Sequence, residues 1–434
     1  MGTALGALGA GEAAPAVAVA RGLGGPSEAT LLGTGERLGA PAAALAAGAL
    51  VHALDFDDTH AEGLVHATAA TLPAALAVGE QVGATGAQVL AAALVGYEVT
   101  CRVAAATPHG FHQRGIHATQ AAGVIGAATV AARLMSLDAA TTAQAMGIAG
   151  SSAGGLLEFL HTGASTKQLH PGLASHAGIV AARLAAAGAT GPVSVLDGPA
   201  GLWATLSARP ANADRVLRGL GETWEVTQIT IKPYPACQLS HAALDATAAL
   251  LVDLAAAGGA GEIVEVVASV HPDSAAIVCE PAADKVRPRS PYDAKFSLAW
   301  SVAAMLLDGA VSVATYAPAS VRRPEVADLA ARVRTVLAPS GVVAADAPGR
   351  VVVRLRDGRE FVGEVARSRG GPDDPMDDDA MLAKVSLVAG ETPAVRRLAA
   401  TMHGLADLPD LAELVDLIAC AAPTPTTPAL GAPA

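Results

Sequence analysis

Long alanine-rich segments, separated by Gly, Pro and Asp, occupy much of the first half of the chain. Between about residues 39 and 226 they include "APAAALAAGALVHALDF", "GAQVLAAALVGYEVTCRVAAA" and "TTAQAMGIAGSSAGGLLEFL", each long enough for at least three helical turns. Apolar runs of this length with breakers between them are typical of α-helices. Hydrophobic residues make up 52% of the chain and aromatic residues only 3%, so Ala, Val and Leu must fill the core. This composition favours closely packed helices and a buried interface between subunits.

The sequence pattern changes near residue 227. "EVTQITIKPYP", "EIVEVVASVHP" and "GRVVVRLRDGREFVGEV" are rich in β-branched residues and predict strands, and "SHAALDATAALLVDLAAAG" and "RPEVADLAARVRTVL" predict helices between them. After "RGGPDDPMDDDA" the pattern is helical again. At 434 residues the chain also exceeds the usual size of one core. We therefore predict a helical domain (residues 1–226 and 376–422), an inserted smaller α/β domain (227–375) and a disordered Pro/Thr-rich tail (423–434).

Charge and cysteine usage exclude several classes of protein. The formal net charge is −12 and no basic run is present, which argues against nucleic-acid binding. The four cysteines are far apart and lack CxxC spacing, so neither a zinc site nor an iron–sulfur cluster is indicated. The N-terminus is a poor signal peptide, and charged residues such as Arg102 and Arg133 interrupt the apolar stretches. We expect a reduced, cytoplasmic protein that neither spans nor binds a membrane.

Lysine is rare in this chain, because only five of the 28 basic residues are Lys. Lys167 in "GASTKQLHPG" and Lys232 in "IKPYPACQLSH" stand beside Gly, Pro and His, as residues do in a site built from loops. An ammonium group is a compact donor to a carboxylate. These two lysines are therefore candidate anchors for an acidic small molecule, although isolated surface lysines are the alternative.

Histidines supply a second set of candidates. His66, His117 and His170 stand in turn-like sequences at predicted helix ends, where an imidazole can meet solvent and substrate. His52 and His176 lie within alanine-rich helices and are expected to be interior or interface residues. The remaining histidines could equally be solvated loop residues without a role in a site. They are His60, His109, His112 and His161.

The stretch "HALDFDDTH", residues 52–60, concentrates three carboxylates and two imidazoles. If the helix continues through it, His52, Asp55 and Thr59 share one face, and this face predicts a polar patch that orients a substrate hydroxyl or an imidazole. The alternative is a frayed helix end whose charged side chains are solvated and have no functional role. An anionic cluster is unfavourable at the negative end of a helix dipole, and this cost favours a functional role.

Metal binding is the competing interpretation of this stretch. "DDTHAE" is similar to the magnesium-binding boxes of prenyl-transfer and terpene-cyclising enzymes, but those enzymes need many aromatic rings and this chain has five Phe, four Tyr and three Trp. A zinc site from His52, Asp55, His60 or His66 matches no established ligand spacing. We predict no metal and no cofactor.

Four stretches together resemble the MmgE/PrpD family, which includes 2-methylcitrate dehydratases and cis-aconitate decarboxylases. They occur in the family's order between residues 33 and 309: "GTGERLGAPAAALAAGALVHALDFDDTH", "TKQLHPGLASHAGIVAARLAAAGATGP", "IKPYPACQLSHAALDA" and "YDAKFSLAWSVAAMLLDG". The resemblance implies a homodimer in which a large helical domain, made from both chain ends, carries a smaller α/β lid. It also implies a cleft lined by residues of both domains.

Matching positions one by one assigns residue roles by resemblance. The implied catalytic residues are His117, His66, Asp55 and Lys167. The implied substrate-binding residues are Thr59, Lys232, His170, Cys237 and Lys295, of which His170 is expected to support other residues and Lys295 is the least secure.

Two departures from the family pattern matter. Cys237 follows "KPYPA" where decarboxylases resembling the animal enzyme have a histidine, and Trp300 stands where they have a tyrosine. The usual proton donor of decarboxylation is thus missing. The start "MGTALGALGAGE" resembles the family's second segment, so we expect either an absent first helix or a misplaced start.

These observations favour a cofactor-independent hydro-lyase acting on a small hydroxy di- or tricarboxylic acid such as 2-methylcitrate. Lys167 and Lys232 bind carboxylates, and His117 or His66 removes the proton alpha to a carboxylate while the other histidine, or a group held by Asp55, protonates the departing hydroxyl. An epimerase or isomerase of a small dicarboxylate is the first alternative. A cis-aconitate-type decarboxylase is the second, and a non-enzymatic helical scaffold is the third.

Overall fold

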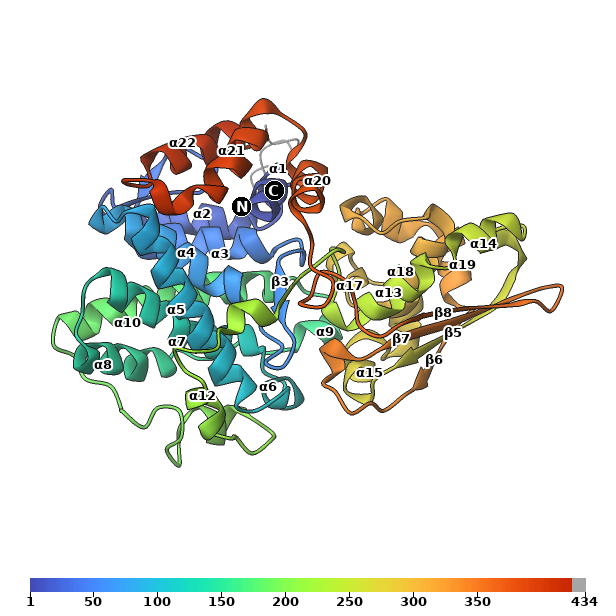
Figure 1. Cartoon of the computed structure of the whole chain (residues 1–434), viewed down its shortest axis with the longest axis horizontal. Helices are drawn as coiled ribbons and strands as arrows, with labels where there is room; N and C mark the ends of the chain where they lie inside the picture. Colours follow the sequence, from blue (N-terminus) through green and yellow to red (C-terminus); the bar gives the residue numbers. More distant parts are fainter. Residues whose placement is uncertain (424–434) are drawn as a thin grey trace, which may run out of the picture. The chain divides into compact units, whose positions relative to one another are not determined.

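A computed structural model describes residues 1–423 and contains two compact units. The first unit comprises Met1–Leu157, Thr166–Ile229 and the residues from Asp377 onward, and the second comprises Glu158–Ser165 and Thr230–Met376. The first is helical, and the second combines helices with a sheet (Figure 1). The prediction of a mostly helical fold with an α/β part is confirmed at this level. The predicted tail, residues 423–434, lies outside the described residues except for Pro423.

The long helices of the first unit surround one buried helix. The helices of this unit are α1 (Gly2–Gly9), α2 (Ala14–Leu23), α3 (Ala40–His52), α4 (Ala67–Val82), α5 (Gly86–Ala105), α6 (Gly110–Gln113), α7 (Ala118–Leu134), α8 (Ala139–Gly150), α10 (His170–Ala186), α11 (Leu202–Leu206), α12 (Asp214–Leu217), α20 (Asp378–Ala389), α21 (Pro393–His403) and α22 (Ala412–Ala421). Helix α7 packs against α4, α5, α8 and α10, and nearly all of its residues are buried. The candidate site residues His52, His66, His117 and His170 lie at the ends of these helices.

Close contact between α3 and α10 explains the need for very small residues. A Cβ atom on Gly48 of α3 would come within 2.6 Å of the Gly172 Cα on α10. A Cβ atom on Gly172 would in turn collide with the Leu45 carbonyl oxygen. The backbones of the two helices therefore approach closely because neither glycine has a side chain, as the composition predicted.

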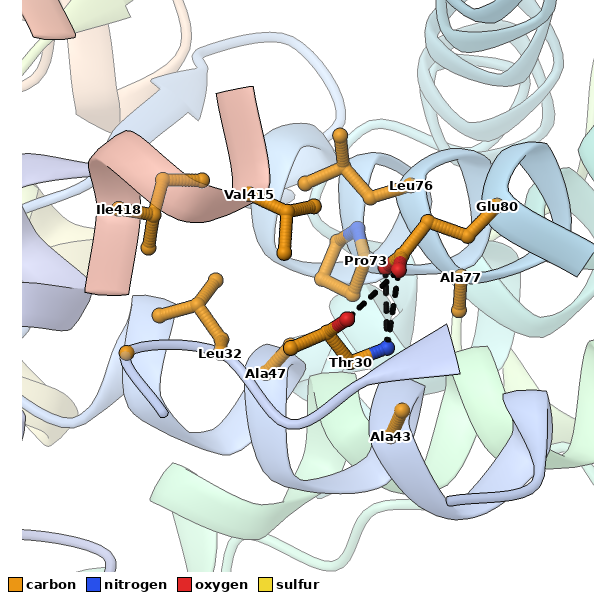
Figure 2. Close-up of a pocket in the computed structure, with 11 residues that line it drawn as sticks. Thr30, Leu32, Ala43, Ala47, Pro73, Leu76, Ala77, Glu80, Val415 and Ile418 are labelled. Carbon is orange, nitrogen blue, oxygen red and sulfur yellow. Dashed lines mark hydrogen bonds between the residues drawn. The ribbon is translucent and has the colours of Figure 1, made fainter. Parts of the chain in front are cut away.

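The two chain ends meet within the first unit. Helix α1 packs against α20, and α21 packs against α22. Val415 and Ile418 of α22 line a small pocket together with Leu32 and with Leu76 of α4 (Figure 2). The C-terminal helices thus complete the apolar packing begun by the N-terminal ones.

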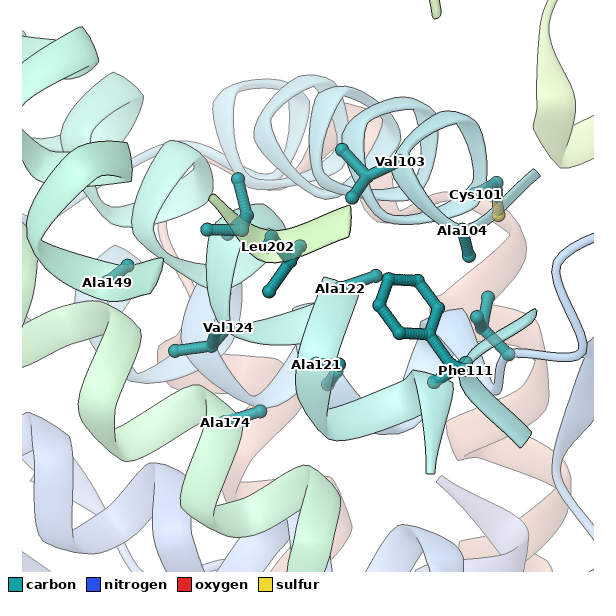
Figure 3. Packing of buried hydrophobic residues seen from close by; sticks show 14 of the residues in the cluster. Cys101, Val103, Ala104, Phe111, Ala121, Ala122, Val124, Ala149, Ala174 and Leu202 are labelled. Atoms are coloured by element: carbon teal, nitrogen blue, oxygen red, sulfur yellow. The ribbon is translucent and has the colours of Figure 1, made fainter. Parts of the chain in front are cut away.

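The core between α5 and α7 is built mostly from small aliphatic side chains, with the buried rings of Phe111 and Trp203 among them. Phe111 is 1% exposed and packs among Ala104 of α5, Ala122 of α7 and Leu202 of α11 (Figure 3). Each buried methyl or methylene contributes about 0.8 kcal/mol. Many small contributions, and not a few large rings, therefore stabilise this unit.

By length and composition alone, helix α5 could cross a membrane, and α1 and α2 pass the same test as a pair bent by 96°. However, 56% of the apolar window of α5 is buried within the protein. Arg102 on α5 is buried and ion-paired with Glu98, and it donates to the carbonyls of Val216 and Arg218. These contacts identify α5 as a core helix and not a membrane span.

The second unit contains a four-stranded sheet in the order β6-β5-β7-β8. Strands β5 (Ile263–Val270) and β6 (Val333–Leu337) are parallel, whereas β7 (Gly349–Leu355) pairs antiparallel with both β5 and β8 (Glu360–Val365). Helix α13 packs on β7 and β8. The helices of this unit are α9 (Phe159–Thr162), α13 (His241–Ala248), α14 (Leu251–Ala256), α15 (Pro272–Val278), α16 (Ala282–Val286), α17 (Pro291–Ala294), α18 (Leu298–Asp308) and α19 (Pro324–Ala330).

Three sequence predictions about these elements are wrong. "RPEVADLAARVRTVL" is helical only to Ala330, because its last residues form β6 beside β5. "TTAQAMGIAGSSAGGLLEFL" is not one helix, since α8 ends at Gly150. Residues 158–165 were expected in the helical domain but belong to the second unit, where the carbonyls of Leu160 and His161 accept hydrogen bonds from Arg289.

Candidate active site

The stretch "HALDFDDTH" does not continue the helix that precedes it. Helix α3 ends at His52, and Asp55 adopts the left-handed conformation with φ 51° while its N–H donates to the His52 carbonyl. Strand β3 then covers Asp58–His60. The predicted shared helical face of His52, Asp55 and Thr59 is therefore wrong. A left-handed residue ends a helix by reversing the chain, and Asp is one of the few non-glycine residues that adopts this conformation readily.

Three of the predicted histidines stand at the N-terminal ends of helices. His66 precedes α4, His117 precedes α7, and His170 is the first residue of α10. The expectation that they lie at helix ends is confirmed, but all three are buried and not open to solvent. Helix N-termini carry partial positive charge and favour anions. Their convergence produces an environment suited to a carboxylate.

The imidazole rings form one cluster inside the first unit. The ring centroids of His66 and His117 are 5.6 Å apart, and those of His117 and His170 are 5.2 Å apart. His52 lies 4.5 Å from His66 and 5.7 Å from His117. His112 packs edge-on against His117 at 5.7 Å. His52 and His112 were not among the predicted site residues, since their alanine-rich and loop-like surroundings gave no signal.

Lys167 brings its ammonium group to this cluster from a distant part of the sequence. It stands in the 3-10 turn Thr166–Leu169 and donates from Nζ to Asp55 Oδ1 at 2.8 Å. The same Nζ lies 3.4 Å from His66 Nε2. Asp55 and Lys167 are both buried, so the pair is an ion pair shielded from solvent. Three of the predicted catalytic residues, Asp55, Lys167 and His66, are thus in direct contact.

Hydrogen bonds fix the tautomer of His66. Its Nδ1 lies 2.6 Å from the Asp58 carbonyl oxygen, which can only accept, so Nδ1 carries the proton. The Thr59 hydroxyl lies 3.4 Å from the same nitrogen. In the neutral ring, Nε2 therefore holds the lone pair and faces Lys167. This arrangement makes His66 Nε2 a proton acceptor that a substrate can use.

Asp57 positions His52 in a similar way. His52 Nδ1 donates to Asp57 Oδ2 at 2.7 Å, and both side chains are buried. His117 Nδ1 lies 3.1 Å from His170 Nδ1, so one of these two rings donates to the other. Each ring is thereby held through its Nδ1, and His52 Nε2 and His117 Nε2 have no hydrogen-bond partner in the part of the chain that the structure describes.

Burial favours the neutral form of His52, His117 and His170. It lowers the pKa of His117 well below its usual value, and the nearby Lys167 charge lowers it further. Burial is also the main reason that the pKa of His170 falls to about 3. Burial lowers the pKa of His52 too, although the Asp57 carboxylate opposes this effect. At neutral pH these rings are bases with an available lone pair.

A neighbouring network of charged residues has a structural role. His60 Nε2 donates to Glu225 at 3.0 Å, while His60 Nδ1 accepts from the Gly63 N–H. Arg215 bridges Glu225 and Glu62. Together these contacts fasten residues 215–225 to the loop that follows β3. Two alternatives left open by the sequence are resolved here, because His60 and His109 are buried and not solvated.

The remaining predicted residues lie in the second unit. Lys232 is fully buried, and Cys237 and Lys295 are adjacent, since the Cys237 N–H donates to the Lys295 carbonyl at 2.9 Å. Lys295 Nζ donates to the Pro235 carbonyl and lies 4.9 Å from the centre of the Tyr316 ring. Trp300 is 1% exposed and belongs to the core of this unit.

All five lysines of the chain are less than 10% exposed. Besides Lys167, Lys232 and Lys295, they are Lys285, which donates to the Ile277 carbonyl, and Lys384, which lies 4.3 Å from the centre of the Phe56 ring. The alternative of isolated surface lysines is therefore wrong. Lys285 and Lys384 were not among the predicted site residues, although the same scarcity of lysine marks them.

The pocket of Figure 2 is not a second candidate for an acidic substrate. Its volume is about 30 Å³, which is close to the volume of one water molecule. The lining is apolar except for Thr30 and Glu80, and Thr30 donates to the Glu80 carboxylate from both its N–H and its hydroxyl group. The pocket is too small and has the wrong charge for a polycarboxylate.

Comparisons with known proteins agree with the family resemblance. The MmgE/PrpD N-terminal domain matches residues 1–213, and the MmgE/PrpD C-terminal domain matches residues 234–403. The chain is 27% identical to a cis-aconitate decarboxylase of Aspergillus terreus (strain NIH 2624 / FGSC A1156) over 84% of this chain and 78% of that protein. It is 28% identical to the Homo sapiens cis-aconitate decarboxylase over 74% of this chain and 66% of that protein.

These relatives also bear on the type of protein. Decarboxylases are lyases, so the prediction of an enzyme of the lyase type in carboxylic acid metabolism is confirmed. The two domain models together cover most of the chain in the order that its motifs indicated. The chain belongs to the MmgE/PrpD family.

Proposed function

We propose that this enzyme is a metal-independent hydro-lyase that removes water from a small hydroxy di- or tricarboxylic acid such as 2-methylcitrate. One observation carries the proposal: the Lys167 ammonium lies between the Asp55 carboxylate and His66 Nε2, inside a buried cluster of neutral histidines. The ammonium offers a binding partner for a substrate carboxylate. The imidazoles offer bases beside it.

The proposed reaction starts when a substrate carboxylate takes over the Lys167 ammonium. His66 Nε2 then loses its neighbour at 3.4 Å and accepts the proton on the carbon alpha to that carboxylate. Lys167 stabilises the negative charge that develops on the carboxylate oxygens. His117 takes up a proton from solvent when the negatively charged substrate binds, and it gives this proton to the hydroxyl on the next carbon. The hydroxyl then leaves as water, and a double bond forms between the two carbons. His117 and His66 can exchange these roles for a substrate bound in the opposite sense.

The bound substrate would also adjust the bases. The pKa of His117 is low because of burial and because Lys167 is near. A polycarboxylate adds negative charge beside the ring and raises that pKa again, since an opposite charge favours the protonated form. A general acid or base is most effective when its pKa is near the working pH.

Several further properties belong to the proposal. They are a homodimer, a cytoplasmic location, an α/β unit that acts as a lid, and binding contributions from Lys232, Cys237 and Lys295. The family resemblance supports the homodimer, the lid and the binding residues, and the scattered cysteines without CxxC spacing support the cytoplasmic location. Substitution of Lys232 by Met should raise KM for the acid more than it lowers kcat, if its ammonium binds a carboxylate that does not react.

Decarboxylation is the second candidate, because the named relatives are cis-aconitate decarboxylases. Cys237 weakens this candidate, since the family's decarboxylases have a histidine there as the proton donor. A thiol is a weaker donor to a carbanion-like intermediate at this position. In dehydration the C–H bond alpha to the carboxylate breaks. In decarboxylation the C–C bond to the carboxylate itself breaks.

One experiment separates the candidates. The enzyme is incubated in D₂O with 2-methylcitrate, citrate or cis-aconitate, with and without EDTA. We expect a rise in absorbance at 240 nm from the hydroxy acids, unaffected by EDTA. Release of CO₂ from cis-aconitate would establish the decarboxylase instead, deuterium incorporation without net reaction would establish an epimerase, and loss of activity with EDTA would refute the metal-independent mechanism.

A further inference from the structure

We infer that His52, His66 and His117 form a binding site for a single Zn²⁺-type transition-metal ion, which inhibits the enzyme by occupying its bases. Each of the three can offer a ring nitrogen within 4.8 Å of the other two, and all three side chains are buried. Three imidazoles with a fourth position open is a ligand set that Zn²⁺ accepts. The inference that the ion binds is independent of the proposed reaction. The inference that the ion inhibits the enzyme rests on the proposed function.

The outer nitrogen of each ring is engaged as in a metal site. His52 Nδ1 donates to the Asp57 carboxylate, and His66 Nδ1 donates to the Asp58 carbonyl. His117 Nδ1 contacts His170. Histidines that bind metals almost always have such a partner on the second nitrogen, because it fixes the tautomer and makes the ligating nitrogen more basic. In this cluster the ligating nitrogen is therefore Nε2 on each ring.

Two of these Nε2 atoms are buried without a hydrogen-bond partner in residues 1–423. They belong to His52 and His117, both 0% exposed. An unsatisfied buried nitrogen costs free energy, and coordination to an ion removes that cost. The ligand nitrogens of a tetrahedral zinc site lie about 3.3 Å apart, so the rings would have to move together by up to about 1.5 Å.

The charges around the histidine cluster determine how tightly it binds a metal ion. Asp55 and Asp57 are buried carboxylates beside the rings, and the Lys167 ammonium balances one of them. The Asp57 carboxylate, which accepts from His52 Nδ1, attracts a divalent cation to the rings. This attraction is opposed by Lys167, whose Nζ lies 3.4 Å from His66 Nε2. Removal of the Lys167 charge should consequently strengthen metal binding while it abolishes catalysis.

Metal binding is measured with Co²⁺, which enters zinc-type sites and absorbs visible light in tetrahedral coordination. EDTA-treated enzyme is dialysed and titrated with Co²⁺, and Zn²⁺ is then added to displace it. We expect one Co²⁺ per chain, a visible spectrum of a four-coordinate ion, and displacement by Zn²⁺. No spectrum, or several equivalent weak sites, would overturn the inference.

Variants place the ion in the cluster. Asp57→Asn keeps the side-chain volume and should weaken binding by about 10–100-fold, the usual cost of losing such an outer partner, and His117→Ala should weaken it more. Lys167→Met should bind Co²⁺ more tightly than the wild type. The matched control is His403→Ala on the exposed end of α21, which should bind like the wild type.

The outcomes separate this inference from the proposed function. Unchanged Co²⁺ affinity in both Asp57→Asn and His117→Ala, with circular dichroism showing folded proteins, would refute the site even if the enzyme is an active hydro-lyase. A Co²⁺ site confirmed in a protein without hydro-lyase activity would refute the proposed reaction only. Weaker binding in Lys167→Met would contradict the electrostatic argument and with it the placement of the ion beside His66.

Discussion

Variants of the ion pair between Lys167 and Asp55 can separate its effect on the free energy of unfolding from its effect on catalysis. Its two atoms are 2.8 Å apart, and the side chains are 6% and 0% exposed. At an effective dielectric constant of about 20 the attraction is about 6 kcal/mol. Burial of the two ions costs several kcal/mol each, so the net contribution of the intact pair to the free energy of unfolding is small.

Breaking the pair has a much larger effect than its net contribution suggests. In Lys167→Met the Asp55 carboxylate stays buried without the ammonium, and loss of one partner of a buried pair costs about 3–5 kcal/mol. The double variant Asp55→Asn/Lys167→Met removes both charges with little change in volume. We expect the double variant to recover most of the lost stability, to within about 1 kcal/mol of the wild type.

Activity should not recover together with stability. Urea unfolding at pH 7 gives the free energy of unfolding, and the absorbance at 240 nm gives the rate for the hydroxy acids. We expect both variants to be inactive, because neither offers an ammonium group to the substrate. A double variant that regains stability and turnover together would show that Lys167 only maintains the fold. A single variant destabilised by less than about 1 kcal/mol would refute the reasoning about the buried pair.

Three further predictions follow from the same geometry. His66→Gln should lower kcat by about 10²–10⁴-fold with a KM within a few-fold of the wild type, and a change confined to KM would contradict its role as a base. The pKa of His170 is about 3 in the folded protein and near 6.5 when unfolded, so the unfolded chain binds more protons below pH 6.5. Stability should therefore fall by about 2 kcal/mol from this group between pH 7 and pH 5, and His170→Asn should show a correspondingly shallower loss in urea unfolding. Gly172→Ala should lower Tm strongly because its Cβ collides with α3, whereas Gly22→Ala, with nothing within 4 Å, should leave Tm unchanged or slightly raised, and equal effects would contradict the packing argument.

Helix composition and lysine usage could be read from the sequence because both depend on local or compositional signals. The alanine-rich repeats contain the apolar periodicity of helices whatever their partners. In an arginine-biased chain, a lysine is retained where a compact ammonium is needed. All five lysines are indeed buried, and a loop context was enough to single out Lys167.

The geometry of "HALDFDDTH" could not be read in the same way. Its composition is compatible with a helix up to Thr59, and the helical reading is wrong because Asp55 takes a left-handed conformation. In that conformation the Asp55 carboxylate accepts a hydrogen bond from Lys167, 112 residues further along the chain. Local propensity gives no information about such a partner. The predictions for the end of α19 and for the break after α8 were wrong for the same reason, since both ends depend on tertiary neighbours.

His52 shows what a sequence signal for this site would look like. A histidine at the last position of a helix, followed five residues later by an aspartate, matches the pair whose atoms lie 2.7 Å apart. Such a spacing alone is weak, because most buried histidines are merely satisfied interior residues. The spacing becomes informative when the same short stretch also contains Asp55. The Asp55 carboxylate forms an ion pair with Lys167, one of the few lysines, beside the same histidine cluster.

The charge balance of the cluster links substrate binding to proton uptake. Burial is the main reason that the pKa of His117 and His170 is low, and the Lys167 charge lowers it further. In the proposed reaction a polycarboxylate that binds Lys167 brings negative charge to the cluster, so a ring that holds no proton without substrate can hold one in the complex. The proposed substrate would thus create the acid that its dehydration requires. In the absence of substrate the same rings present unprotonated nitrogens, and this is the state in which a Zn²⁺-type ion competes for them.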